Sequence, residues 1–270
     1  QAQGIPVTPE VAQAMRVKMG LDRPFLEQYF TWLGRFIRGD MGVSLIDGEP
    51  VWTMLKEAIP RTLLLTASSL LVTVLLAVPL GIFTAVRQNR FSDCLIRFLS
   101  FLGNAMPSFL LSLLLLYLFA LRLRLLPVLA SGTLEGLLLP TLALAIPMSG
   151  RYIRQVRAAV LEQLGQRYVE GAVSRGVPAR RVLLGSVLRN SMTTIITLLS
   201  LSAGSLLGGT AAVERIFSWR GMGYMVMDAI LTRDYPVIQA FMVWMTGLYV
   251  VINLLTDLSY AIVDPRSRKG

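Results

Sequence analysis

The sequence predicts an all-α membrane protein whose chain crosses the bilayer several times. Of its 270 residues, 54% are hydrophobic and only 16% are charged, whereas soluble domains carry about 25% charged residues. Several apolar runs are close to the roughly 20 residues that a helix needs to cross the hydrocarbon core. These runs are continuous instead of alternating, so each span is expected to be a helix and not a strand of a barrel.

Five spans are expected, and no internal repeat relates them. They cover residues 63–86, 95–121, 136–153, 193–213 and 238–263. The third run is the shortest and ends near Arg151 and Arg154, whose long side chains reach the interface from a buried stem. The chain begins with Gln1 and not with Met, so we expect its natural start to lie upstream.

The distribution of charge predicts the direction of insertion. Three segments together carry fourteen Lys and Arg against four Asp and Glu, namely residues 87–97, 151–190 and 264–270. The segments on the other side carry twelve basic and eleven acidic residues. Because basic loops stay in the cytosol, Gly270 is expected inside and the region from Gln1 to Arg61 outside. No aromatic residues interleave with the arginines, which argues against nucleic acid as a partner.

The region before the first span predicts two helices. "PEVAQAMRVKMG" has Pro9 at its start and Gly20 at its end, which are typical helix boundaries. "PFLEQYFTWLGRFIRGD" places several aromatic and aliphatic residues on one helical face. We expect the second helix to lie on the membrane or on the spans, and a docking surface for a soluble partner is the alternative.

Two features of the spans concern the transport path and helix packing. Pro79, Pro107, Pro140 and Pro147 lie in spans, where kinks suit either a translocation path or ordinary packing. Small residues recur every four positions in the fourth span, at Ser200, Gly204 and Gly208. This spacing lets helices approach closely, and we expect this face to pack against a second copy or a sister subunit.

Several kinds of chemistry are excluded by the sequence. It contains no histidine, which removes Ser–His pairs and HExxH zinc sites. It contains no GxxxxGK[ST] loop, so the chain does not hydrolyse ATP by the P-loop route. Cys94 is the single cysteine, which rules out an intrachain disulfide. Asp257 is the one acid well inside a span, and a structural hydrogen-bonding role is favoured over ion coupling.

The basic segment 151–190 predicts a helical hairpin outside the membrane. In "YVEGAVSRGVPARRVL" a short apolar stripe of Val169, Ala172 and Val173 precedes Gly176, which tolerates the left-handed conformation that ends a helix. Pro178 then suits the first turn of a second helix that runs to about Asn190. We expect this hairpin to insert its stripe into a groove on another protein. The alternative is an ordinary loop covered by its own chain.

The hairpin resembles a known family of proteins. Glu170, Gly171, Ala172 and Gly176 are similar to the EAA loop of permease subunits in binding-protein-dependent ABC importers, with Gly171 in place of the first Ala. "LRNSMTTIIT", which includes Arg189 and Asn190, resembles the LRNA(x)xP variant of the peptide/nickel branch, although Thr replaces the usual Pro. The resemblance implies an ATPase-coupling role for Tyr168, Val169, Glu170, Gly171, Ala172, Val173, Gly176, Arg189 and Asn190.

Further motifs extend the resemblance over nearly the whole chain. They include "GDMGVS", "PLGIFTAV", "GNAMPSF" and "GGTAAVERIFSWRGMGYMVMDAILTRDYPVIQ". The resemblance implies the type I permease fold, one more span upstream and a bacterial inner-membrane location. It also implies a sister permease, two ATPase subunits that hold ATP and Mg, and an extracytoplasmic solute-binding protein. Residues implied in permease packing or the path are Met106, Pro107, Ser200, Gly204 and Gly208.

The predicted organisation and function follow from these observations. Residues 1–61 form an extracytoplasmic helical region, residues 62–263 the transmembrane domain with its coupling loop 151–190, and residues 264–270 a cytosolic tail. We expect no enzymatic activity and no cofactor or metal in this chain. An ion-coupled carrier and a lipid-modifying enzyme are the competing hypotheses. "GQRYVEGA" and "RDYPVIQ" look closer to nickel permeases, so the cargo is predicted to be chelated nickel, with a small peptide as the alternative.

Overall fold

The computed structural model describes most of the chain, and its regular structure there is helical. The described residues are 9, 10, 13, 17, 22–129, 133–192, 195, 196, 206 and 209–263, with the side chains of 256, 257 and 259–263 outside the description. Within these ranges the β-type pairing is one isolated antiparallel bridge between Val43 and Pro50. The all-α prediction is therefore confirmed. The predicted helix after Pro9 and the face of Ser200, Gly204 and Gly208 lie largely or wholly outside the described residues.

The first long helix is longer than the predicted span. Helix α3 (Val51–Val86) has 36 residues, or about 54 Å at 1.5 Å per residue, and it begins directly after Pro50. The short helix α2 (Phe25–Ile37) precedes it and confirms the predicted amphipathic helix. Pro60 and Pro79 both lie inside α3 without interrupting it. Proline at these two places therefore does not end the helix.

The second predicted span is broken at Pro107, one of the four prolines at which the sequence indicated kinks. Helix α4 (Phe91–Ala105) and the helical segment α5 (Ser108–Leu115) with η1 (Leu116–Arg122) meet at an angle of 101°. Met106 is extended at the break, with φ −82° and ψ 124°. The physical reason is Pro107, because its ring disfavours helical backbone at the residue before it and it has no N–H to donate.

Helix α6 (Leu134–Leu164) is the central helix of the fold. Thr133 caps its start, where the threonine hydroxyl accepts a hydrogen bond from the Gly136 N–H at 3.1 Å. In the most apolar 18-residue stretch of α6, 67% of the residues are buried. In the corresponding stretch of α12 (Tyr235–Val263) 11% of the residues are buried. The predicted third span is confirmed as a helix, but α6 continues eleven residues past its expected end. Pro140 and Pro147 lie within it without a break.

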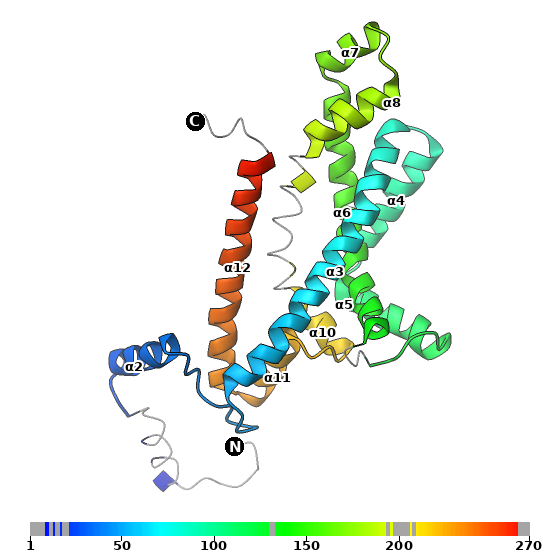
Figure 1. Cartoon of the computed structure of the whole chain (residues 1–270). Helices are drawn as coiled ribbons and strands as arrows, with labels where there is room; N and C mark the ends of the chain where they lie inside the picture. Colours follow the sequence, from blue (N-terminus) through cyan, green and yellow to red (C-terminus); the bar gives the residue numbers. More distant parts are fainter. Residues whose placement is uncertain are drawn as a thin grey trace.

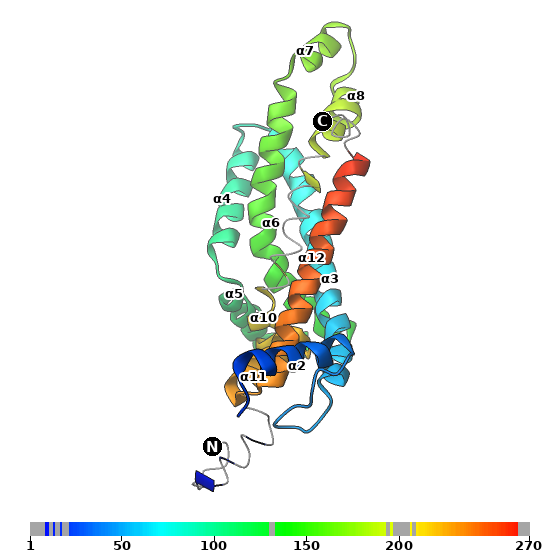
Figure 2. The same ribbon diagram turned by 90° about the vertical axis from the view of Figure 1, so that its left-hand side faces the viewer.

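The long helices run side by side and leave smaller elements at both ends (Figures 1 and 2). At one end lie α7 (Arg167–Ser174), α8 (Ala179–Val182) and η2 (Leu183–Val187). At the other end lie α2, α10 (Ala211–Ile216) and α11 (Met222–Thr232). Among the described residues, three helices are long and apolar enough to cross a membrane, or four if the bent pair counts as one span.

Glycines let α6 approach two neighbouring helices very closely. A Cβ on Gly81 of α3 would lie 2.7 Å from the Val156 Cβ of α6. A Cβ on Gly150 of α6 would lie 2.3 Å from the Ser100 carbonyl oxygen of α4. Such distances leave no room for any side chain, so the three helices pack as one unit at the level of these residues.

Candidate functional site: the tip formed by α7 and α8

The segment from Arg167 to Val182, which we call the tip, projects from the end of α6 (Figure 1). Gly176 has φ +79°, as the sequence predicts for a left-handed corner. The Val177 N–H donates to the Ala172 carbonyl at 3.1 Å, and the Gly176 N–H donates to the Val173 carbonyl at 2.9 Å. These two bonds form a Schellman motif, which satisfies the last carbonyls of α7. The chain therefore turns at Gly176 with its backbone hydrogen bonds preserved.

The second half of the predicted hairpin is also confirmed. Pro178 has φ −62° and precedes the first residue of α8, as its fixed backbone angle favours. The backbone stays helical from α8 through η2 to Met192, two residues beyond the predicted end. The Ser191 hydroxyl donates to the Val187 carbonyl at 2.9 Å and lies 3.5 Å from the Ala159 carbonyl on α6. The returning helix is therefore fixed against α6.

The apolar stripe of the tip is divided between two uses, which corrects the expectation that all of it is free for a partner. Val169 is only 8% exposed and packs with Val160, Val182 and Val187, with Ala172 and Val177 against the same cluster. The reason is that α8 and η2 fold back and supply an apolar surface of their own. Val173 is 55% exposed and Tyr168 is 38% exposed. These two residues and Glu170 are thus part of the outer surface of the tip, which also includes the exposed Arg167, Ser174 and Arg175.

The other residues predicted for coupling are Gly171 on α7 and two residues outside α7, Arg189 and Asn190. A Cβ on Gly171 would lie 3.7 Å from an Arg175 Nη1, which is an ordinary contact. The structure therefore has room for the alanine that the EAA pattern has at this position. Arg189 and Asn190 are exposed but lie on the returning helix, away from the corner at Gly176. Tyr168, Glu170 and Val173 are exposed positions of α7, whereas Arg189 and Asn190 lie outside that helix.

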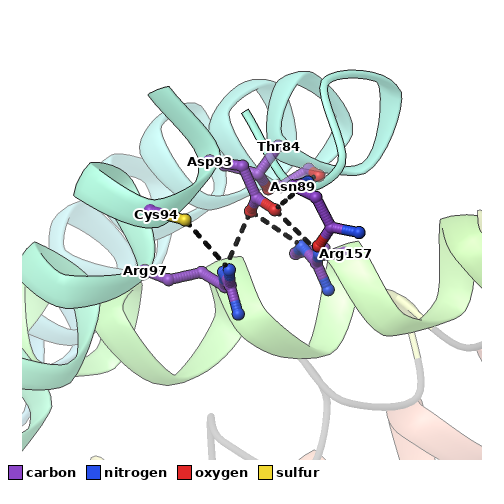
Figure 3. Close-up of polar contacts among 7 residues, drawn as sticks. Thr84, Asn89, Asp93, Cys94, Arg97 and Arg157 are labelled. Atoms are coloured by element: carbon purple, nitrogen blue, oxygen red, sulfur yellow. Dashed lines mark hydrogen bonds and ion pairs between the residues drawn. The ribbon is translucent and has the colours of Figure 1, made fainter. Parts of the chain in front are cut away.

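A buried carboxylate connects the root of the tip to two other elements (Figure 3). Asp93 on α4 is 0% exposed, and Arg157 on α6 donates to it through Nε at 3.0 Å and through Nη2 at 2.9 Å. The backbone N–H of Asn89, in the turn between α3 and α4, donates to Oδ2 at 3.0 Å. The Arg97 Nε lies 3.1 Å from Oδ1. We call these four residues the clamp.

The sequence analysis missed the clamp. Asp93 entered it only as one acidic charge among the arginines of residues 87–97. The available signal was that a lone acid in a basic segment of a membrane protein needs a cationic partner. The sequence could not indicate Arg157 as that partner, because the two residues are 64 positions apart.

A second buried carboxylate fixes the opposite end of the molecule. Glu214 of α10 accepts hydrogen bonds from the Thr62 hydroxyl at 2.8 Å and from the Tyr224 N–H at 3.0 Å. The Thr62 oxygen accepts from the Met222 N–H at 2.7 Å. The indole N–H of Trp219 donates to the Arg61 carbonyl at 2.9 Å. These bonds fix α10 and α11 to α3, and the sequence analysis did not identify them.

Met106 and Pro107, which resemblance assigns to packing or the path, lie at the 101° break between α4 and α5. Met106 is half-buried and Pro107 is exposed. The remaining residues of that group fall outside the described part of the chain. The structure thus places a bend at this pair.

The fold is that of a multi-pass helical membrane protein with a tip that projects from the end of α6. A solved inward-facing structure of the MetNI methionine ABC transporter has the same fold, with a TM-score of 0.67. It is 16% identical in sequence, and the match covers 80% of this chain and 99% of that one. This similarity confirms the predicted type I permease fold.

Sequence comparisons identify the family. A family model described as the inner membrane component of binding-protein-dependent transport systems matches residues 77–269. The chain belongs to this family, and it is therefore a membrane-embedded permease component of such a transport system, and not itself the catalytic part. A putative peptide permease of Brucella ovis is 38% identical, over 97% of this chain and 86% of that protein.

Other relatives have names that refer to different cargoes. An oligopeptide transport system permease of Bacillus subtilis is 36% identical, over 98% of this chain and 90% of that protein. A metal-staphylopine import system permease of Staphylococcus aureus is 34% identical, over 100% of this chain and 86% of that protein. The nickel specificity that the sequence favoured has no specific support among these proteins.

Proposed function

We propose that this chain is one of two transmembrane subunits of an ATP-driven importer, and that its tip receives the mechanical input from an ATPase subunit. The observation that carries the proposal is the position of Tyr168, Glu170 and Val173. They are exposed on α7, while Val169 beside them is anchored in the chain's own core. A rigid base under an exposed apolar and charged surface is suited to a protein groove, because little ordering is needed on binding.

The connection from the tip to the spans runs through α6. This helix is continuous from Leu134 to Leu164, so a displacement at the tip is carried along it. The clamp ties the same helix to α4 through the two-point pair of Arg157 and Asp93. Movement of α6 therefore carries α4 with it, and the bend at Met106–Pro107 lies at the far end of α4.

The proposed assembly follows the family. It contains a sister permease, two ATPase subunits that bind ATP and Mg, and an extracytoplasmic solute-binding protein, while this chain holds no cofactor. The tip and Gly270 lie in the cytosol, and the region from Gln1 to Arg61 lies outside. In this proposal residues 1–61, 62–263 and 264–270 are the extracytoplasmic region, the transmembrane domain with its coupling loop 151–190, and the tail. The charge distribution supports this orientation.

A small peptide is the cargo that we propose, and a chelated metal ion such as nickel is the second candidate. The similarity to the Brucella ovis and Bacillus subtilis proteins supports the first, because both are named as peptide permeases. The similarity to the metal-staphylopine permease over the whole chain supports the second.

Two measurements test this proposal separately. The chain, purified in mild detergent with its native partners, should bring P-loop ATPase subunits with it, as an ion-coupled carrier would not. If no ATPase subunit purified with the chain, the importer assignment would be overturned. Calorimetry of the partner binding protein with a peptide library and with metal chelates decides the cargo. Tight binding of chelates alone would replace the peptide proposal and leave the importer assignment unchanged.

A further inference from the structure

Helix α2 has one broad apolar side and one polar side. Successive residues of a helix are about 100° apart, which places its eight large apolar residues on one side. These are Phe25, Leu26, Tyr29, Phe30, Trp32, Leu33, Phe36 and Ile37. The polar residues Glu27, Gln28, Thr31 and Arg35 occupy the other side. This pattern is typical of a helix that lies in the plane of a membrane surface.

Only part of this apolar side is covered by the chain itself. Phe36 packs against the core that contains Val51 and Leu55, and Trp32 lies against Phe36 with ring centroids 5.4 Å apart. The other edge of the apolar side is open. Leu26 is 65% exposed, Phe30 is 64% exposed and Ile37 is 76% exposed there, and Phe25, at the start of the helix on the side of Trp32 and Phe36, is 77% exposed. Large aromatic and aliphatic side chains in such a row need a nonpolar environment outside the described chain.

Two tryptophans, Trp52 and Trp244, lie in contact with each other beside the end of α2. Met41, four residues after α2, accepts a hydrogen bond at its sulfur from the Trp244 indole N–H at 3.3 Å. Trp244 stacks on Trp52 with centroids 5.4 Å apart, and the Lys56 ammonium lies 5.0 Å from the centre of the Trp52 ring. Tryptophans are enriched at the boundary between hydrocarbon and water. Trp244 lies on α12, nine residues or about 14 Å after that helix begins at Tyr235.

The direction of α2 agrees with a position at a membrane–water interface. In both views α2 lies across the direction of α12 and beside the end of the bundle that carries α11 (Figures 1 and 2). In Figure 1 it extends sideways away from the long helices. A helix that lies across the direction of the long helices at their end is oriented as a helix in the plane of a membrane surface would be.

We propose that α2 is an interfacial membrane anchor whose open edge, Leu26, Phe30 and Ile37, is inserted among the lipids of the leaflet at the α11 end, together with Phe25 at the start of the helix. The charge of the segment indicates whether the helix needs anionic lipid. Residues 22–40 carry three acidic and three basic side chains, so burial of apolar surface holds the helix and attraction to anionic lipid does not. The anchor fixes the height of α11 and of the start of α12 relative to the bilayer. This inference does not depend on the nature of the cargo.

Spin labels at neighbouring positions test the proposal. In a Cys94→Ser background, Phe30→Cys and Thr31→Cys place a label on the apolar and on the polar side of the same turn. The importer, purified with its partner subunits, is reconstituted in phosphatidylcholine nanodiscs. Collision with oxygen, which concentrates in lipid, and with water-soluble chromium oxalate measures the environment of each label. The oxygen-to-chromium ratio should be several-fold higher at residue 30 than at residue 31, and adding phosphatidylglycerol should not change it.

Ile37→Cys and Arg38→Cys form a second pair at the other end of α2, in case one substitution prevents folding. Low accessibility of residues 30 and 37 to both reagents would show that a protein partner covers this edge and would overturn the proposal. High accessibility of both to chromium oxalate would show an aqueous surface and overturn it equally. A ratio that rises only when anionic lipid is added would contradict the part of the proposal that concerns charge.

Discussion

Asp93 on α4 and Arg157 on α6 form a two-point ion pair, with Oδ1 3.0 Å from Nε and Oδ2 2.9 Å from Nη2. The aspartate is fully buried and the arginine side chain is 16% exposed. Breaking a buried pair of this kind costs about 3–5 kcal/mol, because the remaining charge stays buried without its partner. The pair therefore holds the two helices together at the root of the tip.

Asp93→Asn should lower the free energy of unfolding by about 3 kcal/mol or more, since it leaves Arg157 and Arg97 facing a neutral amide. Thermal unfolding of the purified protein in detergent measures this change. Asp228→Asn is the matched control, because its pair with Arg215 at 2.6 Å is solvent-exposed and exposed pairs contribute less than about 1 kcal/mol. Equal losses in the two variants would contradict the structural role of the clamp.

Gly150→Ala should separate α6 from α4. Its Cβ would lie 2.3 Å from the Ser100 carbonyl oxygen, and the backbone cannot turn away as a flexible side chain does. Overpacking of this kind costs about 1–3 kcal/mol, which the same unfolding measurement detects. Gly185→Ala is the control, because nothing lies within 4 Å of its Cβ. A stable Gly150→Ala protein would show that the described packing of α4 on α6 is wrong.

Two glycines of the tip should respond in opposite directions. Gly171→Ala should stabilise the protein by about 0.5–1 kcal/mol, because it removes backbone freedom from a helix and meets only an ordinary contact. Gly176→Ala should destabilise it by about 1–2 kcal/mol, because φ +79° places the new Cβ close to the following carbonyl. Differential scanning fluorimetry compares the two. The same sign for both would contradict the corner at Gly176.

Thr62→Val tests the attachment of α10 and α11 to α3. It removes the hydroxyl that donates to Glu214 and accepts from the Met222 N–H. Leaving buried groups without partners costs about 1–3 kcal/mol, which chemical unfolding of the purified protein should show. Thr246→Val is the control, since its exposed hydroxyl only donates to the Met242 carbonyl of its own helix. If both variants unfold at the same denaturant concentration, the hydrogen bonds at Thr62 do not hold this end together.

The local parts of the fold could be predicted from the sequence, and the parts made by distant residues could not. Gly176 and Pro178 predict the corner of the tip because each restricts its own backbone. Pro107 and Pro79 have the same local chemistry, yet one lies at a 101° break and the other lies inside α3. The residue type alone therefore does not tell which proline breaks its helix. The burial of Val169 was missed because its cover comes from Val182 and Val187 further along the chain.

The sequence predicted an apolar stripe on the tip, but not which of its residues would be buried. A pattern on α7 identified an apolar stripe, and the structure divides it into an inner part at Val169 and Ala172 and an outer part at Val173. A helical period places residues on a common face. It does not say which of them the returning helix will cover. Glu170 is the charged residue of this outer surface whose role is most directly open to measurement.

The central claim is that the tip couples an ATPase subunit to transport. Its most direct test measures ATP hydrolysis and uptake together, in proteoliposomes that contain all partner subunits and the binding protein. Glu170→Ala should reduce substrate-stimulated uptake by about tenfold or more, because loss of one partner of a buried interfacial charge pair costs about 2–5 kcal/mol. Gly176→Pro should do the same, because proline cannot adopt φ +79° and removes the N–H bonded to Val173. Glu162→Ala, an exposed acid on α6 outside the tip, should leave uptake unchanged. Normal coupled uptake in both tip variants, with the control unchanged, would contradict the role of the tip in coupling.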